Sequence, residues 1–235
     1  MGRFAWTSRL LIGVAGLVVL TACEVGRPGY TYRYRLTLSV LDHGKASSAS
    51  SVVEVTEHPA WKGPYGLPFL AFHQVCGEAT VLPLRNGKYL LALLSGGSYP
   101  EPGDPGWRIT PTQVLLHHLQ LNEDWTTDPS GIKALASGSK MVSLTRHEDL
   151  PGFVVVADKD NPLSFRGSPW PSLDPEWLGD GIFFKSLTIQ ATTDSVTSGA
   201  VPRAFPWLRW YNLRHRLFQN EVRMGFTPQQ FQRCD

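Results

Sequence analysis

Apolar and polar side chains alternate along residues 30–40, which read YTYRYRLTLSV. This period of two predicts a strand with one buried and one exposed face. Turn-forming residues follow at 42–45, and the segment SVVEVTE at 51–57 is predicted to return as the partner strand after a polar, serine-rich connection. The alternating residues are Tyr32, Tyr34, Leu36, Leu38 and Val40 on the apolar face and Arg33, Arg35, Thr37 and Ser39 on the polar face.

A second hairpin is predicted around the dipeptide Asn86-Gly87. The apolar segments EATVLPL (78–84) and KYLLALL (88–94) flank it, and Asn-Gly readily adopts the positive φ angles of a tight turn. Because Pro83 has no backbone N–H, it predicts a sheet edge or a bulge near this turn.

Three further elements follow along the chain. Thr110 and Pro111 open a predicted helix, PTQVLLHHLQL, because proline suits the first helical turn. The segment GFVVVADKDNP from Gly152 predicts a buried strand that runs into an acidic turn, and IFFKSLTIQAT from Ile182 predicts another strand. In the acidic turn, Asx-type closure explains the acids more simply than a cation site, because the further oxygens of an EF-hand are missing.

The segment FPWLRWYNLRHRLFQNEVRMG at 205–225 predicts an amphipathic helix, with Pro206 at its start and Gly225 as its cap. Two interpretations stay open. The helix either docks on the core of the domain, or lies against anionic headgroups or a partner protein. The residues predicted to make a membrane or partner contact are Trp207, Arg209, Trp210, Arg216 and Arg223.

These elements together predict a single α+β domain. It consists mainly of antiparallel β hairpins with two or three helices, including the amphipathic C-terminal one. The 22 glycines and 18 prolines favour many turns and argue against a helical bundle.

The N-terminal segment changes the picture of where this domain resides. Arg3 and Arg9 precede an apolar stretch at 10–22, which is thirteen residues long, whereas a transmembrane helix needs about 20. This pattern is typical of a secretory signal peptide. The residues Leu20-Thr21-Ala22-Cys23 resemble the bacterial lipobox, in which the cysteine is diacylated and becomes the new N-terminus.

We therefore predict a lipoprotein signal peptide at 1–22 and one envelope domain at 23–235, anchored through lipid on Cys23 and facing the periplasm. Two acyl chains are enough for stable anchoring. The alternatives are an uncleaved hydrophobic anchor and an ordinary secretion signal. Glu24 follows the cysteine in place of an aspartate, which favours the outer over the inner membrane.

The charge balance of the predicted mature chain is neutral. The full chain has 22 Lys and Arg against 20 Asp and Glu, and residues 1–22 contribute two arginines and no acid. A neutral domain lacks the basic surface with which proteins bind phosphates, so nucleic acid is not an expected partner. The expected partners are a membrane, through the lipid anchor, and an envelope protein.

Two cysteines remain if Cys23 carries lipid. Cys76 and Cys234 are an even number in an oxidising compartment, where thiols pair. The two alternatives are a Cys76–Cys234 disulfide, which would tie the C-terminus to the middle of the fold, and a pair of free buried thiols.

No motif of catalysis or metal binding in the sequence identifies a candidate residue. Ser137-Gly138-Ser139-Lys140 matches SxxK, but that motif needs a helix to bring the serine and the lysine one turn apart, and a glycine interrupts it here. His117 and His118 are adjacent, point in different directions on a helix, and have no acid or histidine at i+3 or i+4. No catalytic residue, metal site or cofactor is predicted.

The chain contains, in this order, the segments YRYRLTLSV, SSVVEV, GEATVLPLRNGKYLLALL, VVVADKDNPLSF, LGDGIFFKSLTIQATTDSVTSG and PWL. This ordered set resembles an uncharacterised family of proteobacterial envelope-associated proteins. The family has no assigned activity, so the resemblance implies no catalytic residue. The chain departs from the family at Ala157, where two adjacent aspartates are usual.

The leading hypothesis is a non-enzymatic envelope lipoprotein with an interaction or structural role. The alternative is an envelope hydrolase or small-ligand-binding protein. A pocket that gathers His73, His117 or Asp158 would support the alternative.

Overall fold

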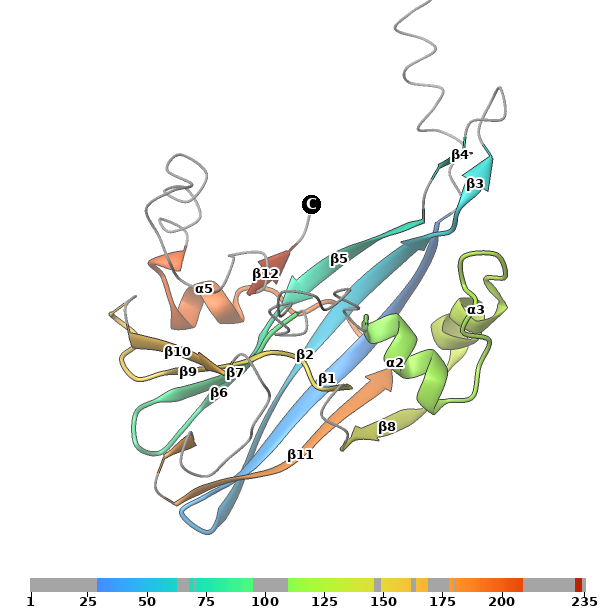
Figure 1. Ribbon diagram of the computed structural model, residues 1–235. Helices are drawn as coiled ribbons and strands as arrows, with labels where there is room; N and C mark the ends of the chain where they lie inside the picture. The colour runs from blue at the N-terminus through green and yellow to red at the C-terminus, as the bar shows by residue number, and fades with distance from the viewer. Residues whose placement is uncertain are drawn as a thin grey trace, which may run out of the picture.

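The computed structural model describes residues 29–62, 68–69, 71–94, 110–145, 149–161, 164–168, 178–179, 181–208 and 231–233. Two antiparallel sheets and a short two-stranded ribbon make up the β structure (Figure 1). The larger sheet has the strand order β12-β5-β2-β1-β11-β8, and the smaller sheet has the order β10-β9-β7-β6. The predicted α+β fold with mainly antiparallel sheet is confirmed.

The bounds of the elements are as follows. The larger sheet contains β1 (Tyr30–Asp42), β2 (Lys45–His58), β5 (Phe72–Glu78), β8 (Met141–Leu144), β11 (Ile182–Ala191) and β12 (Gln232–Arg233). The smaller sheet contains β6 (Thr80–Pro83), β7 (Tyr89–Ala92), β9 (Phe153–Val156) and β10 (Phe165–Ser168), and the ribbon contains β3 (Trp61–Lys62) and β4 (Pro68–Phe69). The helices of the described residues are α2 (Pro111–His118), α3 (Ser130–Ser137) and α5 (Ala200–Ala204).

The β1–β2 hairpin is the longest unit of the fold. The alternation in β1 is as predicted, with all five apolar residues from Tyr32 to Val40 buried. The predicted serine-rich connection is wrong: Asp42 pairs directly with Lys45, and β2 already begins there. His43 and Gly44 both have positive φ, 50° and 78°, and this geometry matches the twist of a two-residue hairpin turn. The serines therefore belong to the strand.

The β6–β7 hairpin is confirmed, with Gly87 at φ 81° in its turn. Pro83 lies on β6, an edge strand, as its missing N–H predicts. Only Ala79 separates β5 from β6, so the chain passes from one sheet to the other within a few residues. Gly77 makes this passage with φ 151°, and a Cβ there would lie 3.1 Å from the Cα of Val53.

The central strands of the smaller sheet, β7 and β9, are buried on both faces. Along β9, Phe153 and Val155 face the core shared with the larger sheet, whereas Val154 and Val156 face a second core. Phe205, beside α5, packs into that second core. A strand that is covered on both sides reads as an unbroken apolar run, which explains the sequence FVVV.

Helices α2 and α3 cover the other half of the inner face of the larger sheet (Figure 1). Helix α2 begins at Pro111 as predicted, and Thr110 caps it: the side chain of Thr110 accepts the N–H of Gln113, and the side chain of Gln113 accepts the N–H of Thr110. Gly131, in the first turn of α3, lies close to the preceding loop, where a Cβ would clash with the carbonyl oxygen of Asn122.

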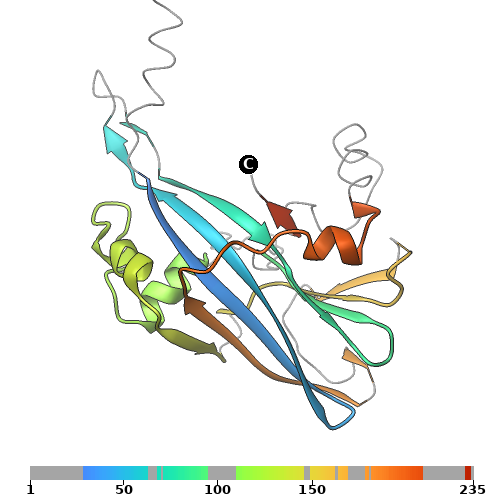
Figure 2. The same cartoon turned by 180° about the vertical axis from the view of Figure 1, so that it is seen from behind.

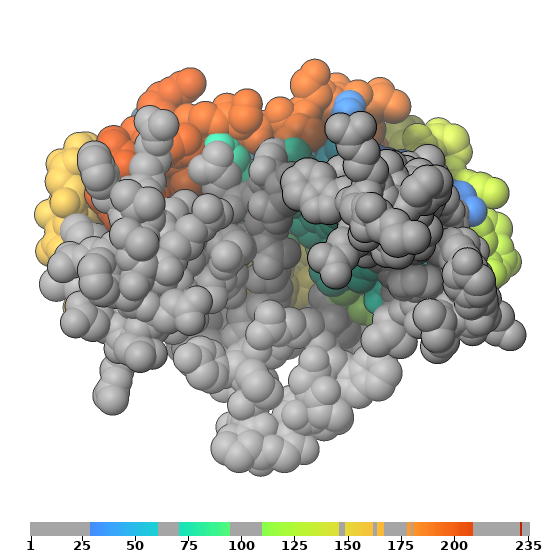
Figure 3. All heavy atoms as spheres, turned by 90° about the horizontal axis from the view of Figure 1, so that it is seen from above, coloured from blue at the N-terminus to red at the C-terminus, as the bar shows by residue number. Residues whose placement is uncertain are grey.

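A connecting segment crosses the outer face of the larger sheet. Residues 192–199 run from the end of β11 across β1 and β2 to α5 (Figure 2). The N–H of Thr192 bonds the carbonyl of Arg33, and Thr197 exchanges hydrogen bonds with the backbone of Val52. Viewed from above, this segment joins the end of the molecule that carries α5 to the end that carries α3 (Figure 3).

Candidate functional site around helix α2

Helix α2 carries a polar side chain toward each of its ends. Thr112 lies in its first turn and is fully buried. His118 is its last residue and bonds Asp149. The capping box and Pro111 set the residue at which the helix begins, and this determines which of its side chains face the sheet. The helix thereby brings two separate polar groups against the apolar inner face of the sheet.

The first group is a buried chain of hydrogen bonds. The hydroxyl of Tyr32 lies 2.8 Å from that of Thr112, and Thr112 donates to Oε1 of Glu57. The other carboxyl oxygen of Glu57, Oε2, is buried and has no hydrogen-bond partner among the described residues. Burial raises the pKa of Glu57 to about 7, although the bond from Thr112 opposes this rise. Burial also raises the pKa of Tyr32.

The position of Glu57 follows from the pairing of β2. The core-facing residues of this strand alternate as Val53, Val55 and Glu57, so the acid occupies a position that the pattern reserves for an apolar side chain. Sequence reasoning missed it, although this break in the alternation was visible. A buried acid without full hydrogen bonding is uncommon, because an isolated buried charge is costly. Glu57 can bind or release a proton near neutral pH, which is the chemistry that this network offers.

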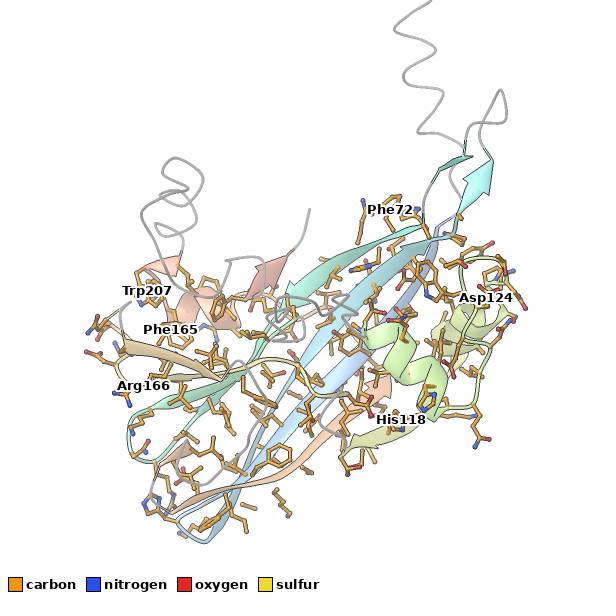
Figure 4. The ribbon with its side chains drawn as sticks, viewed as in Figure 1. Phe72, His118, Asp124, Phe165, Arg166 and Trp207 are labelled. Carbon is orange, nitrogen blue, oxygen red and sulfur yellow. The ribbon has the colours of Figure 1, made fainter. Side chains whose placement is uncertain are left out.

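The second group is the carboxylate–imidazole pair of Asp149 and His118. Figure 4 shows His118 at the end of α2. Nε2 of His118 lies 2.7 Å from Oδ2 of Asp149, and their side chains are 21% and 6% exposed. Asp149 also lines a small pocket of about 40 Å³ between α2, β1 and residues 149–151, together with Tyr34 and Val114. This volume suits two or three waters and is far below the several hundred Å³ of a typical substrate pocket.

A larger pocket of about 240 Å³ lies beside α3. Its lining is mainly apolar and includes Leu121 and Leu135, with Ser137 and Lys140 as its polar members. Helix α3 ends at Ser137, and Gly138 is extended. The helical spacing that the SxxK chemistry needs is therefore absent between Ser137 and Lys140. The hydroxyl of Ser137 instead bonds carbonyls of its own helix.

The three residues named for a hydrolase or ligand site lie on different elements. His73 is on β5, His117 is on α2 and Asp158 follows β9, and each side chain is exposed. His117 bonds Glu123 at 3.0 Å. Asp158 closes an Asx turn by accepting the N–H of Asp160 at 3.0 Å, which agrees with the predicted turn. The structure therefore does not bring these three together.

Cys76 is bonded in a disulfide, and its partner lies outside the described residues. Strand β12 pairs with β5 in the register Gln232 to Glu78 and Arg233 to Gly77. Gly77 and Arg233 are the sequence neighbours of Cys76 and Cys234. The pairing of Cys76 with Cys234 stays a prediction that this register supports.

Among the residues predicted for membrane or partner contact, the structure describes Trp207. Its indole N–H donates to the carbonyl of Lys159 at 2.7 Å, and its ring packs edge-on against Phe165 (Figure 4). Both rings adjoin Phe205. The predictions for the other positions lie outside the described residues. They concern Cys23, Arg209, Trp210, Arg216, Arg223 and residues 209–225 of the amphipathic helix. At the predicted start of that helix, Pro206 and Trp207 form a turn.

No cluster of three or more His, Cys, Asp or Glu side chains suited to a metal ion occurs in the described segments. No helix in them has both the length and the apolar character to span a bilayer.

Comparison with family models, with curated proteins and with solved structures found no match for the chain.

Proposed function

We propose that the chain is a lipid-anchored protein of the bacterial cell envelope with a non-enzymatic interaction or structural role. The observation that carries this proposal is the sequence Leu20-Thr21-Ala22-Cys23 at the end of a signal-like segment. Cys23 stands six residues before Gly29, the first described residue, which adjoins the start of β1. A lipid on Cys23 would therefore hold the sheet by one end, close to the bilayer. The resemblance to an envelope-associated family agrees with this proposal.

The buried acids of the domain support a structural role for its polar groups. Asp42 accepts hydrogen bonds from the backbone N–H of Arg85 and from the imidazole of His43. It thereby links the β6–β7 turn to the β1–β2 turn. Glu78 accepts the backbone N–H groups of Gly199 and Ala200 at the start of α5. In both cases the carboxylate satisfies donors that would otherwise be left unpaired. These acids connect elements of the fold that are far apart in the sequence.

The test of the lipid anchor is metabolic labelling with palmitate in bacteria that express the full chain. We expect label on the wild type and none on Cys23→Ser. Globomycin, which blocks the lipoprotein signal peptidase, should make the precursor accumulate. A matched control is Cys234→Ser, which removes another cysteine and should keep the label. An unlabelled wild-type chain, or a mature N-terminus other than residue 23, would overturn the proposal.

A second candidate function, binding of a small amphipathic ligand, rests on the pocket beside α3. An apolar lining with a cationic group at its edge suits a carboxylate on an alkyl chain. Titration calorimetry of decanoate into the Cys23→Ser chain tests this candidate. Lys140→Met should weaken decanoate binding and Leu121→Trp should block it, whereas Lys45→Met at the start of β2 should leave it unchanged. If decanoate gives no heat of binding with the unmodified pocket, this candidate fails.

A further inference from the structure

The ribbon formed by β3 and β4 continues the larger sheet at the end where β1 begins. Tyr30 pairs with Glu57, and Phe72 pairs with His58 on the neighbouring strand. The chain leaves β2 after His58 and enters β3 at Trp61. The ribbon therefore projects beyond the sheet at this end, and the β1–β2 turn lies at the opposite end (Figure 1).

The same end of the sheet is the one to which a lipid on Cys23 would be attached. Six residues from Cys23 to Gly29 span at most about 20 Å when fully extended. The thirteen residues of β1 extend over roughly 40 Å. The tether is thus about half as long as the sheet. It holds the ribbon close to the bilayer surface and leaves the far end of the sheet free to point away from it.

The residue types of the ribbon suit the surface of a membrane. Trp61 is the cross-strand partner of Phe69, and Lys62 is the partner of Pro68. Aromatic residues concentrate at the level of the lipid headgroups, and lysine there meets anionic lipid. A two-stranded ribbon of this size is marginal in water by itself, because it has little apolar area to bury.

We infer that the β3–β4 ribbon is a second membrane contact, which lies among the headgroups of the bilayer that holds the Cys23 lipid. This inference rests on the proposed lipid anchor. The ribbon and the lipid together fix the orientation of the domain: the ribbon faces the bilayer, and the β1–β2 turn points away from it. With the lipid on Cys23 alone, the domain could rotate relative to the bilayer. A second contact through the ribbon restricts that rotation.

Photocrosslinking in cells tests this orientation on the full chain. The photoreactive amino acid p-benzoylphenylalanine replaces Trp61 in one variant and Phe69 in a second. The matched control replaces Phe183, an aromatic residue that is 49% exposed on β11 and is paired with Leu41 near the far turn. We expect phospholipid crosslinks from positions 61 and 69 and background levels from position 183. Palmitate label is measured on the same samples.

Vesicle binding of the Cys23→Ser chain gives a readout that does not depend on the lipid anchor. With vesicles of phosphatidylethanolamine and phosphatidylglycerol, Trp61→Ser should lower the partition constant about tenfold, because one aromatic residue loses its apolar burial. Phe183→Ser should leave the constant unchanged. A palmitate-labelled chain that crosslinks no more lipid from 61 and 69 than from 183 overturns the inference and leaves the anchor standing. An unlabelled chain overturns the anchor itself.

Discussion

The buried carboxyl of Glu57 predicts an unusual dependence of stability on pH. Its pKa is about 7 in the folded protein against 4.5 for an unperturbed glutamate. The folded chain therefore holds this proton more tightly than the unfolded chain. Between about pH 4.5 and pH 7 the folded state carries the extra proton, so the free energy of unfolding falls as the pH rises through this window. Above about pH 7 the carboxyl of Glu57 is charged in the folded protein, so the full cost of burying that charge lowers the free energy of unfolding.

The magnitude follows from the two proton affinities. Each tenfold difference in proton affinity between the folded and the unfolded chain corresponds to about 1.4 kcal/mol of unfolding free energy. The pKa difference at Glu57 therefore corresponds to about 2–3 kcal/mol, after allowance for solvent that reaches the carboxyl. Glu57→Gln keeps the shape and the acceptor for Thr112 but carries no charge. We expect this variant to match the wild type at about pH 5 and to be about 2–3 kcal/mol more stable at about pH 8.

Urea unfolding of the Cys23→Ser chain, followed by tryptophan fluorescence, measures this difference. The control is Glu54→Gln, on the same strand but facing outward, where the acid pairs with Arg33 at 2.7 Å and is 27% exposed. That variant should show no gain in stability at the higher pH, since an exposed pair contributes little. If the difference between wild type and Glu57→Gln is the same at both pH values, Glu57 does not titrate near neutrality in the folded state and the reasoning is wrong.

Three further predictions concern how the elements are held together. Glu78→Gln should destabilise the fold by about 1–3 kcal/mol, because the N–H groups at the start of α5 lose a charged acceptor; thermal unfolding measures this, and an unchanged midpoint would contradict it. Gly131→Ala should cost about 1–3 kcal/mol or more, since the added Cβ meets the carbonyl of Asn122, and a urea midpoint equal to that of wild type would refute the close approach. Cys76→Ser and Cys234→Ser should each lower stability by about 2–4 kcal/mol and remove the same disulfide; mass spectrometry of non-reduced peptides would show a different partner if the pairing is wrong.

Local structure of this protein was predictable from short stretches of sequence. Alternation gave the buried face of β1, Asn86-Gly87 gave the second hairpin, and Thr110 with Pro111 gave the start of α2. Each of these signals acts between residues that are close in the chain, through backbone conformation or side-chain period. The failure at the serine-rich segment has the same origin. Serine is common in turns and loops, but in β2 pairing with β1 outweighed that preference.

The candidate site depended on contacts between distant residues, and no local signal describes them. Glu57 became a proton-binding group only because β1 and α2 brought Tyr32 and Thr112 against it. His118 met Asp149 across 31 positions of sequence, and Glu78 met the start of α5 across more than 120.

The sequence by itself determined the hairpins, the capped helix and the expectation of a lipid on Cys23. The tertiary structure decided which acids are buried, that β5 and β12 pair beside Cys76, and that the β3–β4 ribbon shares an end of the sheet with the start of β1. The physical reason is that backbone preferences act over a few residues. Desolvation and the pairing of distant strands exist only once the whole chain has folded.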